Sequence, residues 1–312
     1  MTRVAVLEIQ GCLPSSAAIT HDVMATANRI SAARKRTLPF DVHTVRCGPR
    51  GNSTELRNAE LIIVPGLGSA SGNELEEKLR GPACRRAGKM LVDAFKSGAT
   101  LAASCASTFL LADAGLLDGR RATTTWWLAP LFRRRYPKVE LVSEQMVVAD
   151  WPIATGGAAM AQMDLMLAVV ARFAAPRLAK ACANYLLLDD RRSQAPFMAI
   201  THLAGQDPKI VKAESWVRNN IARDFAIEEL AEAVALAPRT FARRMALICG
   251  LSPIQFVQRI RIETARFLLE TTRLSVEQIA RQIGYAESST LRRLIRRETK
   301  HSPRHFRSLA PK

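Results

Sequence analysis

The pattern of hydrophobic residues changes once along this sequence, and the change predicts two domains of different architecture. Through about residue 174, short runs rich in β-branched residues alternate with segments of helical periodicity. The predicted strands are 3–9, 40–47, 60–66, 99–105 and 139–149, and the predicted helices are 20–36, 73–98, 106–116, 126–135 and one within 154–174. Such alternation is typical of βαβ units, in which helices cover a mostly parallel sheet. From residue 209 onward the periodicity is helical.

Residues 187–208 interrupt both patterns. The segment mixes charged residues with proline and glycine and has no clear period, which is typical of a linker. We therefore predict an α/β domain over 1–186, a linker over 187–208 and an all-α domain over 209–312. A chain of 312 residues is long enough for two domains of ordinary size.

The chain is strongly basic, and more than half of the excess lies in the predicted all-α domain. The formal net charge is +17, and residues 209–312 contain 20 Lys and Arg against 10 Asp and Glu. A concentrated positive charge favours a polyanionic partner, although composition alone is equally compatible with a solvated basic surface.

Other features of the composition exclude several classes of protein. No apolar run is long enough to span a membrane, and the N-terminus lacks the layout of a signal peptide, so a cytoplasmic protein without membrane contact is expected. The six cysteines form no Cys-x-x-Cys pair and no cluster with histidine. We therefore expect no disulfide framework, no metal site and no cofactor.

Residues 275–303 have the pattern of two short helices joined by a tight turn. Apolar residues at i, i+3, i+4 and i+7 from Val276 form one helical face, and Gly284 can end that helix. Ser288 can cap a second helix, whose apolar stripe lies opposite a group of arginines. Those arginines are Arg292, Arg293, Arg296 and Arg297. This pattern predicts a helix-turn-helix unit whose second helix can enter a major groove.

The same pattern occurs earlier, over 226–253. The turn is "LAP" at 236–238, and the second helix carries Arg239, Arg243 and Arg244 opposite its apolar residues. A helix over 254–273 connects the two units. One unit alone could equally belong to a helical bundle with a solvated basic face, but two such units favour DNA binding.

Residues 209–312 resemble the DNA-binding domain of AraC/XylS-type transcriptional activators. The resemblance rests on "LSVEQIARQIGYAESSTLRRLIRRETKHSPRHFR" (274–307), "RTFARRM" (239–245) and "GLSP" (250–253). It implies that the two units occupy successive major-groove segments on one face of DNA. The implied base-contacting residues are Arg239, Arg243, Ser288, Ser289 and Arg293, and the implied phosphate-contacting residues are Thr290, Arg297 and Lys300.

A second candidate site surrounds Cys105, where "LAASCASTFLLADAG" (101–115) passes from a predicted strand into a predicted helix. Small neighbours are typical of a nucleophile elbow, because the side chain sits on a sharp turn. A free cysteine is also a common buried residue, so this position alone is weak evidence for catalysis. A thiol nucleophile needs a base, and neither His21 nor His43 is predicted to face the elbow.

Together with "AGLLDGRRATTTWW" (114–127), this stretch resembles the sensor domain of GlxA-type regulators, a class I glutamine amidotransferase-like (PfpI-type) domain that precedes an AraC-type domain. The resemblance covers roughly 1–185, and a flavodoxin-like α/β fold is expected there. The family commonly has histidine where this chain has Thr125, and a carboxylate in the loop where this chain has "QGCLPSSAAI" (10–19). We therefore expect no catalysis by Cys105 and no enzyme activity.

The carboxyl ends of the predicted parallel strands are the expected place for a ligand, because open α/β sheets bind their ligands there. The candidate ligand-binding residues are Gly66, Gly68, Cys105, Ala106, Thr125 and Gly156. The alternative is that these segments are ordinary strand-to-helix turns.

Together these features predict a sequence-specific transcriptional regulator that binds double-stranded promoter DNA and responds to an unidentified small-molecule effector. A homodimer and contact with RNA polymerase are expected from the family resemblance. The alternatives are a cysteine-dependent hydrolase or amidotransferase and a thiol sensor, both of which would use Cys105.

Overall fold

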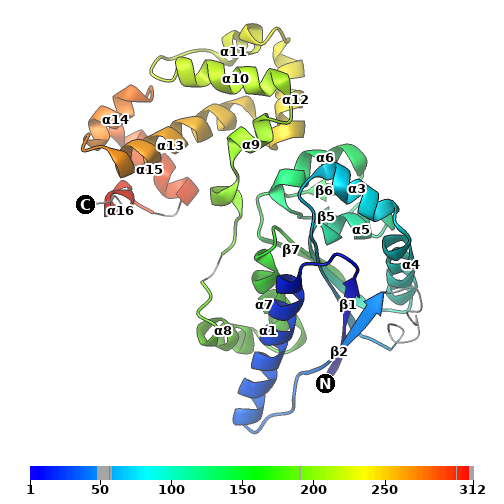
Figure 1. Ribbon diagram of the computed structural model, residues 1–312. Helices are drawn as coiled ribbons and strands as arrows, with labels where there is room; N and C mark the ends of the chain where they lie inside the picture. The colour runs from blue at the N-terminus through cyan, green and yellow to red at the C-terminus, as the bar shows by residue number, and fades with distance from the viewer. Residues whose placement is uncertain (48–55, 57, 190, 300, 309–312) are drawn as a thin grey trace. The chain divides into compact units, whose positions relative to one another are not determined.

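A computed structural model describes the chain except residues 48–55, 57, 190, 300 and 309–312. The chain forms two compact units, Met1–Ala195 and Pro196–Lys312 (Figure 1). The first unit contains a sheet covered by helices, and the second is helical throughout the part that the structure describes. The predicted α/β and all-α architectures are therefore confirmed.

The first unit is built on a six-stranded sheet with the strand order β2-β1-β3-β4-β8-β7. Its strands are β1 (Thr2–Ile9), β2 (Phe40–Cys47), β3 (Leu61–Leu67), β4 (Thr100–Cys105), β7 (Val147–Asp150) and β8 (Ile153–Gly156). All neighbours are parallel except β7 and β8, which form an antiparallel pair. A separate two-stranded sheet pairs β5 (Arg121–Ala122) with β6 (Glu140–Leu141). The carboxyl ends of β1, β3 and β4 therefore meet at one edge of the main sheet.

Helices cover both faces of this sheet (Figure 1). Alternate strand residues point to opposite faces, so Leu61 and Ile63 of β3 pack in one core while Ile62 and Val64 pack in the other. The first face is covered by α1 (Pro14–Ala33), α7 (Ala161–Phe173) and α8 (Pro176–Tyr185). The second is covered by α3 (Gly72–Arg80), α4 (Pro82–Lys96), α5 (Ser107–Asp113) and α6 (Ala129–Arg135).

Two predicted elements of the first unit were wrong in extent, and two observed elements were not predicted. The predicted strand 139–149 is divided between β6 in the small sheet and β7 in the main sheet, because residues 142–146 form a turn that pairs with the segment around Ser193. The predicted helix 73–98 breaks at Gly81, since Pro82 disfavours helical backbone at the preceding residue. The strand β8 and the helix α8 were not predicted.

The predicted linker contains ordered structure. A 3-10 turn covers Ala195–Phe197 and a short helix, α9, covers Ile200–Ala204. Ile200 and Leu203 are buried in the second unit, while Gln194 is buried in the first. The division between the two units therefore falls inside the predicted linker, between 195 and 196.

The second unit consists of α9 and seven further helices within the described residues. These are α10 (Pro208–Asn219), α11 (Ile227–Ala233), α12 (Pro238–Cys249), α13 (Pro253–Thr271), α14 (Val276–Gln282), α15 (Ser288–Thr299) and α16 (Pro303–Ser308). Ser252 and Ser275 begin α13 and α14 with capping boxes, in which the serine hydroxyl and a glutamine side chain satisfy backbone N–H groups. None of the described helices is long and apolar enough to cross a membrane.

Candidate nucleic-acid interface and elbow site

The first helix-turn-helix unit pairs α11 with α12. Its turn contains Ala235 at φ 54°, which reverses the chain so that Leu230 of α11 packs with Phe241 and Met245 of α12. Arg239 and Arg243 lie on the exposed face of α12 and make no ion pair with any residue that the structure describes. Two guanidinium groups are thus available on the outer face of the second helix, as predicted for base contacts.

Arg244, which was also predicted to face outward, is 40% exposed but pairs with a carboxylate. Its Nε donates to Oδ2 of Asp207 at 2.6 Å, and the other oxygen of Asp207 accepts from the first turn of α10. Asp207 is buried and Arg244 is partly exposed, so this ion pair joins α12 to the start of α10 at the border of the surface. Removing either partner would leave a charge in a partly desolvated site.

The second helix-turn-helix unit pairs α14 with α15. Gly284, at φ 81°, ends the turn that follows α14, as predicted. Leu291, Leu294 and Ile295 are buried, and all four arginines of the opposite face are exposed. Arg292 is bound to Glu277 of α14 at 2.9 Å, whereas Arg293 has no ion-pair partner among the described residues. Of the α15 residues predicted to contact bases, Arg293 therefore supplies a charged side chain that is exposed and has no ion pair with the described residues.

The remaining predicted DNA contacts are spread over the rest of α15. Ser288 is the first residue of the helix, and its hydroxyl donates to Glu277 at 3.2 Å instead of capping the helix. The Ser289 hydroxyl donates to Glu287, and Thr290 is half-buried. Arg297 is held by Glu298 and Gln258 at 3.0 and 3.2 Å. Lys300 lies outside the described residues.

Glu277 is the anionic group of this surface. Its own backbone N–H, Arg292 and nearby hydroxyls lower the pKa of Glu277 to about 2. The carboxylate therefore stays charged at neutral pH and orients Arg292 and Ser288 on the exposed side of the recognition helix. Sequence analysis predicted the arginines but not this acidic partner.

A buried arginine connects the two helix-turn-helix units. Arg261 of α13 is 9% exposed, and its guanidinium lies over the rings of Phe225 and Tyr285 at 5.5 and 5.3 Å. It also donates to the carbonyl oxygen of Arg223 at 3.0 Å. Sequence analysis missed this residue, although its spacing of four from both Val257 and Ala265 places it on the apolar face of α13.

Gly284 packs directly against the same cluster. A Cβ at this position would lie 2.5 Å from the carbonyl oxygen of Ile221 and 2.8 Å from Nη2 of Arg261. The turn between α14 and α15 therefore touches the loop before α11, and no space is left for a side chain at Gly284. Arg261 and Gly284 together pack the loop before α11 against the turn between α14 and α15.

Cys105 occupies the corner between β4 and α5 in the geometry of a nucleophile elbow. Its φ is 54°, an uncommon value for a residue with a side chain, and it is 4% exposed. Its backbone N–H donates to the carbonyl oxygen of Gly157, and its carbonyl oxygen accepts from the Thr124 hydroxyl, both at 2.8 Å. These bonds hold the backbone of the elbow between the 123–125 loop and the end of β8.

The environment of the thiol disfavours its reactive form. Burial raises the pKa of Cys105, and the Ala106 N–H and Thr125 hydroxyl oppose this only in part. The thiolate is the nucleophilic form of cysteine, so the raised pKa makes Cys105 a poor nucleophile at neutral pH.

Neither histidine of the first unit is placed to act as the base. His21 of α1 hydrogen-bonds Thr44 of β2 at 3.1 Å, and His43 also lies on β2. The strand β2 is three positions from β4 in the sheet, which is about 14 Å at the usual strand spacing. The other three histidines belong to the second unit.

The structure brings together some of the predicted ligand-binding residues and separates others. Cys105, Ala106 and Thr125 are adjacent and buried, and a Cβ on Gly66 would lie 3.0 Å from Cβ of Cys105. The N–H of Gly68, which was predicted to face a ligand, is instead donated to the carbonyl oxygen of Gly11 at 2.9 Å.

Gly156 faces a different neighbour. A Cβ on Gly156 would lie 3.3 Å from Cβ of Ser104, the residue before the elbow. It therefore adjoins the side of β4 opposite to the Cys105 side chain.

Several buried hydroxyl groups at this edge of the sheet have unused hydrogen-bonding capacity. The oxygens of Ser16 and Ser104 have no hydrogen-bond partner among the described residues. Those of Ser16 and Ser104 both lie within 3.4 Å of the point where Gly66 would carry a Cβ. Buried polar groups without partners are costly, so a small polar molecule or water that reached them would gain hydrogen bonds already oriented by the fold.

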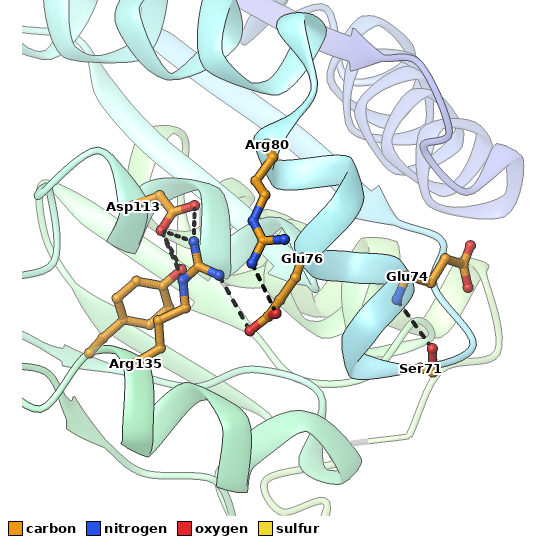
Figure 2. Close-up of polar contacts among 7 residues, drawn as sticks. Ser71, Glu74, Glu76, Arg80, Asp113 and Arg135 are labelled. Atoms are coloured by element: carbon orange, nitrogen blue, oxygen red, sulfur yellow. Dashed lines mark hydrogen bonds and ion pairs between the residues drawn. The ribbon is translucent and has the colours of Figure 1, made fainter.

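The three helices that follow the elbow loops are joined by one ionic network (Figure 2). Arg135 of α6 donates to Asp113 of α5 at 3.0 Å and pairs with Glu76 of α3 at 3.6 Å. Tyr136 donates to the same Asp113 carboxylate at 2.6 Å, and Arg80 pairs with Glu76 at 3.4 Å. Because α3, α5 and α6 follow the Gly66, Cys105 and Thr125 segments, the network holds these three walls of the elbow together.

Gln194 forms the remaining wall and was not predicted. Its side chain is buried, and its Nε2 donates to the carbonyl oxygens of Ser143 and Thr124 at 2.7 and 2.9 Å. Its Oε1 accepts from the N–H of Ala158 at 3.2 Å. The sequence offered little indication of this, because a glutamine in a polar segment of irregular pattern is ordinarily exposed.

A cavity of about 550 Å³ lies elsewhere in the first unit, between α7, α8 and the start of the predicted linker. Apolar side chains such as Leu167 and Leu188 line it, together with the ion pair of Asp164 and Arg191 at 2.6 Å. Its size is within the range of small-molecule sites. None of the predicted ligand-binding residues lines it.

Comparison with known families matches both units. Residues 22–172 match the DJ-1/PfpI family, and residues 230–308 match a helix-turn-helix domain family. The first match contains the elbow and the second contains both helix-turn-helix units.

Curated relatives of this chain include two regulators of Pseudomonas aeruginosa. The HTH-type transcriptional regulator CdhR is 29% identical over 219 residues, which are 69% of this chain and 65% of that protein. The HTH-type transcriptional regulator ArgR is 29% identical over 196 residues, which are 61% of this chain and 59% of that protein. The chain thus spans less than two thirds of the length of the curated relatives it matches.

A solved structure also resembles the first unit. An AraC family transcriptional regulator from Pseudomonas putida is 18% identical with a TM-score of 0.48, and the match covers 60% of this chain and 100% of that one.

Proposed function

We propose that this chain, in which a DJ-1/PfpI-family domain precedes an AraC-type helix-turn-helix domain, is a sequence-specific DNA-binding transcriptional regulator. The observation that carries the proposal is the pair of helix-turn-helix units with exposed, unpaired arginines on both second helices. Arginine in the major groove binds guanine through two hydrogen bonds, the commonest specific contact. Regulators among the relatives support the same function.

Within this function, we assign base contacts to Arg239, Arg243 and Arg293, with Ser288 and Ser289 at the start of α15. Hydroxyl groups accept several bases, so the second half-site should tolerate more sequence variation than the first. Thr290, Arg297 and Lys300 are assigned to phosphates, which fix position without specifying sequence. The DNA partner is a double-stranded promoter in the cytoplasm, bound by a homodimer that also contacts RNA polymerase.

The first unit is proposed to sense a small-molecule effector rather than to catalyse a reaction. The raised pKa of Cys105 and the positions of His21 and His43 at β2, three strands from β4, argue against a thiol nucleophile. The unpartnered hydroxyls of Ser16 and Ser104 favour binding of a polar ligand at the elbow. An effector changes DNA occupancy only if it binds one arrangement of the protein more tightly than another.

A cysteine-dependent hydrolase is the second candidate, favoured by the positive φ of Cys105 at a strand-to-helix corner. It would be supported by hydrolysis of an activated ester or of glutamine that Cys105→Ala abolishes. Equal rates for both proteins would remove this candidate, and the absence of oxidation at Cys105 under mild peroxide would remove the thiol sensor.

The regulator function is tested by selecting sequences from random double-stranded DNA with the full chain, then measuring fluorescence anisotropy at ~150 mM salt, where non-specific phosphate contacts are weakened. The expected result is a consensus with two half-sites and a preference over shuffled DNA of ~10³-fold or more. Uniform weak binding to selected and shuffled DNA would refute sequence-specific regulation.

A further inference from the structure

We propose that Gln194 is a positioning residue of the elbow site and couples that site to the segment by which the chain leaves the first unit. The inference deepens the proposed function, because it assigns the route by which an occupied elbow would act on the part of the chain that precedes the DNA-binding unit. Gln194 is one residue from the end of the first unit at Ala195.

The amide of Gln194 is fully engaged inside the first unit. Its two Nε2 hydrogens are directed at the carbonyl oxygens of Ser143 and Thr124, and its Oε1 accepts from Ala158. A Cβ on Gly157 would lie 2.6 Å from Oε1 of Gln194, so the side chain occupies a space that only glycine leaves open. A buried amide with all its hydrogen bonds made specifies one position for the backbone that carries it.

Two short paths connect this amide to the elbow. Gln194 donates to the carbonyl oxygen of Thr124, whose hydroxyl donates to the carbonyl oxygen of Cys105. On the other side, the amide packs on Gly157, whose carbonyl oxygen accepts the N–H of Cys105. Any movement of the elbow that displaces Thr124 or Gly157 therefore also displaces a group bound to Gln194.

The other walls of the elbow are tied to one another rather than to the end of the first unit. The helices after Gly66, Cys105 and Thr125 are joined by Arg135 and its carboxylate partners (Figure 2). By contrast, residues 192–194 are held by backbone hydrogen bonds to Glu144 and Met146 and by the Gln194 side chain. Because this segment ends the first unit at Ala195, a displacement of Gln194 is passed to the chain that leaves the unit.

Coupling of this kind is reciprocal. If a change at the elbow weakens the position of Gln194, then release of Gln194 must change the elbow by the same factor. The elbow and the Gln194 segment can each be probed through residues that the chain already contains. Iodoacetamide reports access to the Cys105 thiol, and trypsin reports release of the segment by cleaving after Arg191 and Arg192.

The test compares the full chain with Gln194→Leu and Gly157→Ala, and measures both probes by mass spectrometry. Leucine keeps the volume of Gln194 without its hydrogen bonds, and alanine at 157 displaces the amide without changing it. Both variants should accelerate Cys105 alkylation and cleavage after Arg192 by about tenfold or more, while alkylation of the partly exposed Cys12 stays unchanged. Alkylation of Cys105 in the unmodified chain should accelerate cleavage after Arg192 in the same way.

Gln162→Leu is the matched control. Gln162 is a buried glutamine of the same unit that donates to Thr20 at 2.8 Å and has no hydrogen bond to the 192–194 segment. It should destabilise the unit without changing cleavage after Arg192. The proposal is overturned if both test variants remain folded by circular dichroism and cleave at the unmodified rate, or if all three variants accelerate cleavage equally. Because these measurements use no DNA, they can fail while sequence-specific DNA binding holds, and the reverse.

Discussion

Replacing Gly284 with alanine should destabilise the second unit by about 2–5 kcal/mol. The backbone at Gly284 has φ 81°, a conformation that costs a residue with a side chain about 1–2 kcal/mol. The new Cβ would also lie 2.5 Å from the carbonyl oxygen of Ile221, a backbone atom that cannot rotate away. Overpacking of this kind typically costs about 1–3 kcal/mol, so the two contributions add to the stated range.

Hydrogen exchange in increasing urea measures this loss, because peptides of α10 to α15 report the second unit separately from the first. At a urea dependence of about 1–3 kcal/mol per molar, the unfolding midpoint of these peptides should fall by roughly 0.7–5 M. Gly119→Ala is the matched control, since Gly119 has φ 72° and no atom within 4 Å of its Cβ position. If Gly284→Ala lowers the unfolding free energy of the second unit no more than Gly119→Ala lowers that of the first unit, the packing contact is refuted.

Three further predictions concern DNA binding and the thiol. Arg239→Ala should cost about 1–3 kcal/mol on the selected DNA and relax specificity at one base pair, as measured by anisotropy on a panel of single-base variants; an equal loss on every sequence would contradict its role. Arg297→Ala should weaken binding to all sequences alike and reduce the slope of log affinity against log salt by about one, whereas a loss confined to one base pair would assign it to base contact instead. Cys105 should be alkylated in the folded chain only at a pH above that needed in urea, because burial raises the pKa of its thiol. The stability that the neutral thiol contributes is present below the pKa of the unfolded state and is lost as the pH rises through the pKa of the folded state. Equal pH profiles of alkylation for the folded and the urea-unfolded chain would be inconsistent with the buried elbow.

The helical part of the fold could be predicted well from sequence, because its determinants are local. Apolar spacing located both helix-turn-helix units, and Gly284 marked a turn that needs a positive φ. The elbow was likewise predicted from the small residues around Cys105. In each case a short stretch of chain specifies its own backbone.

Features that depend on distant partners could not be predicted in this way. The predicted strand over 139–149 divides because its middle pairs with the segment at Ser193, some fifty residues later in the chain. Arg244 has the spacing of an exposed residue and turns to Asp207, a partner visible only in three dimensions. Gln194 and Arg261 were missed for the same reason, since polar side chains are buried where their partners are, and those partners lie in other elements.

Arg261 has a consequence for how a genome is searched. A half-site of a few base pairs recurs by chance at very many places, and each mismatch costs only about 1–3 kcal/mol. Arg261 lies between Phe225, just before the first helix-turn-helix unit, and Tyr285, in the turn of the second. The two helix-turn-helix units are therefore not free to move independently of each other. A sequence must then present both half-sites at one separation, and correct half-sites at any other spacing count as wrong. For the proposed binding to two half-sites, one guanidinium buried away from the DNA-facing surface would thereby remove most chance matches from competition.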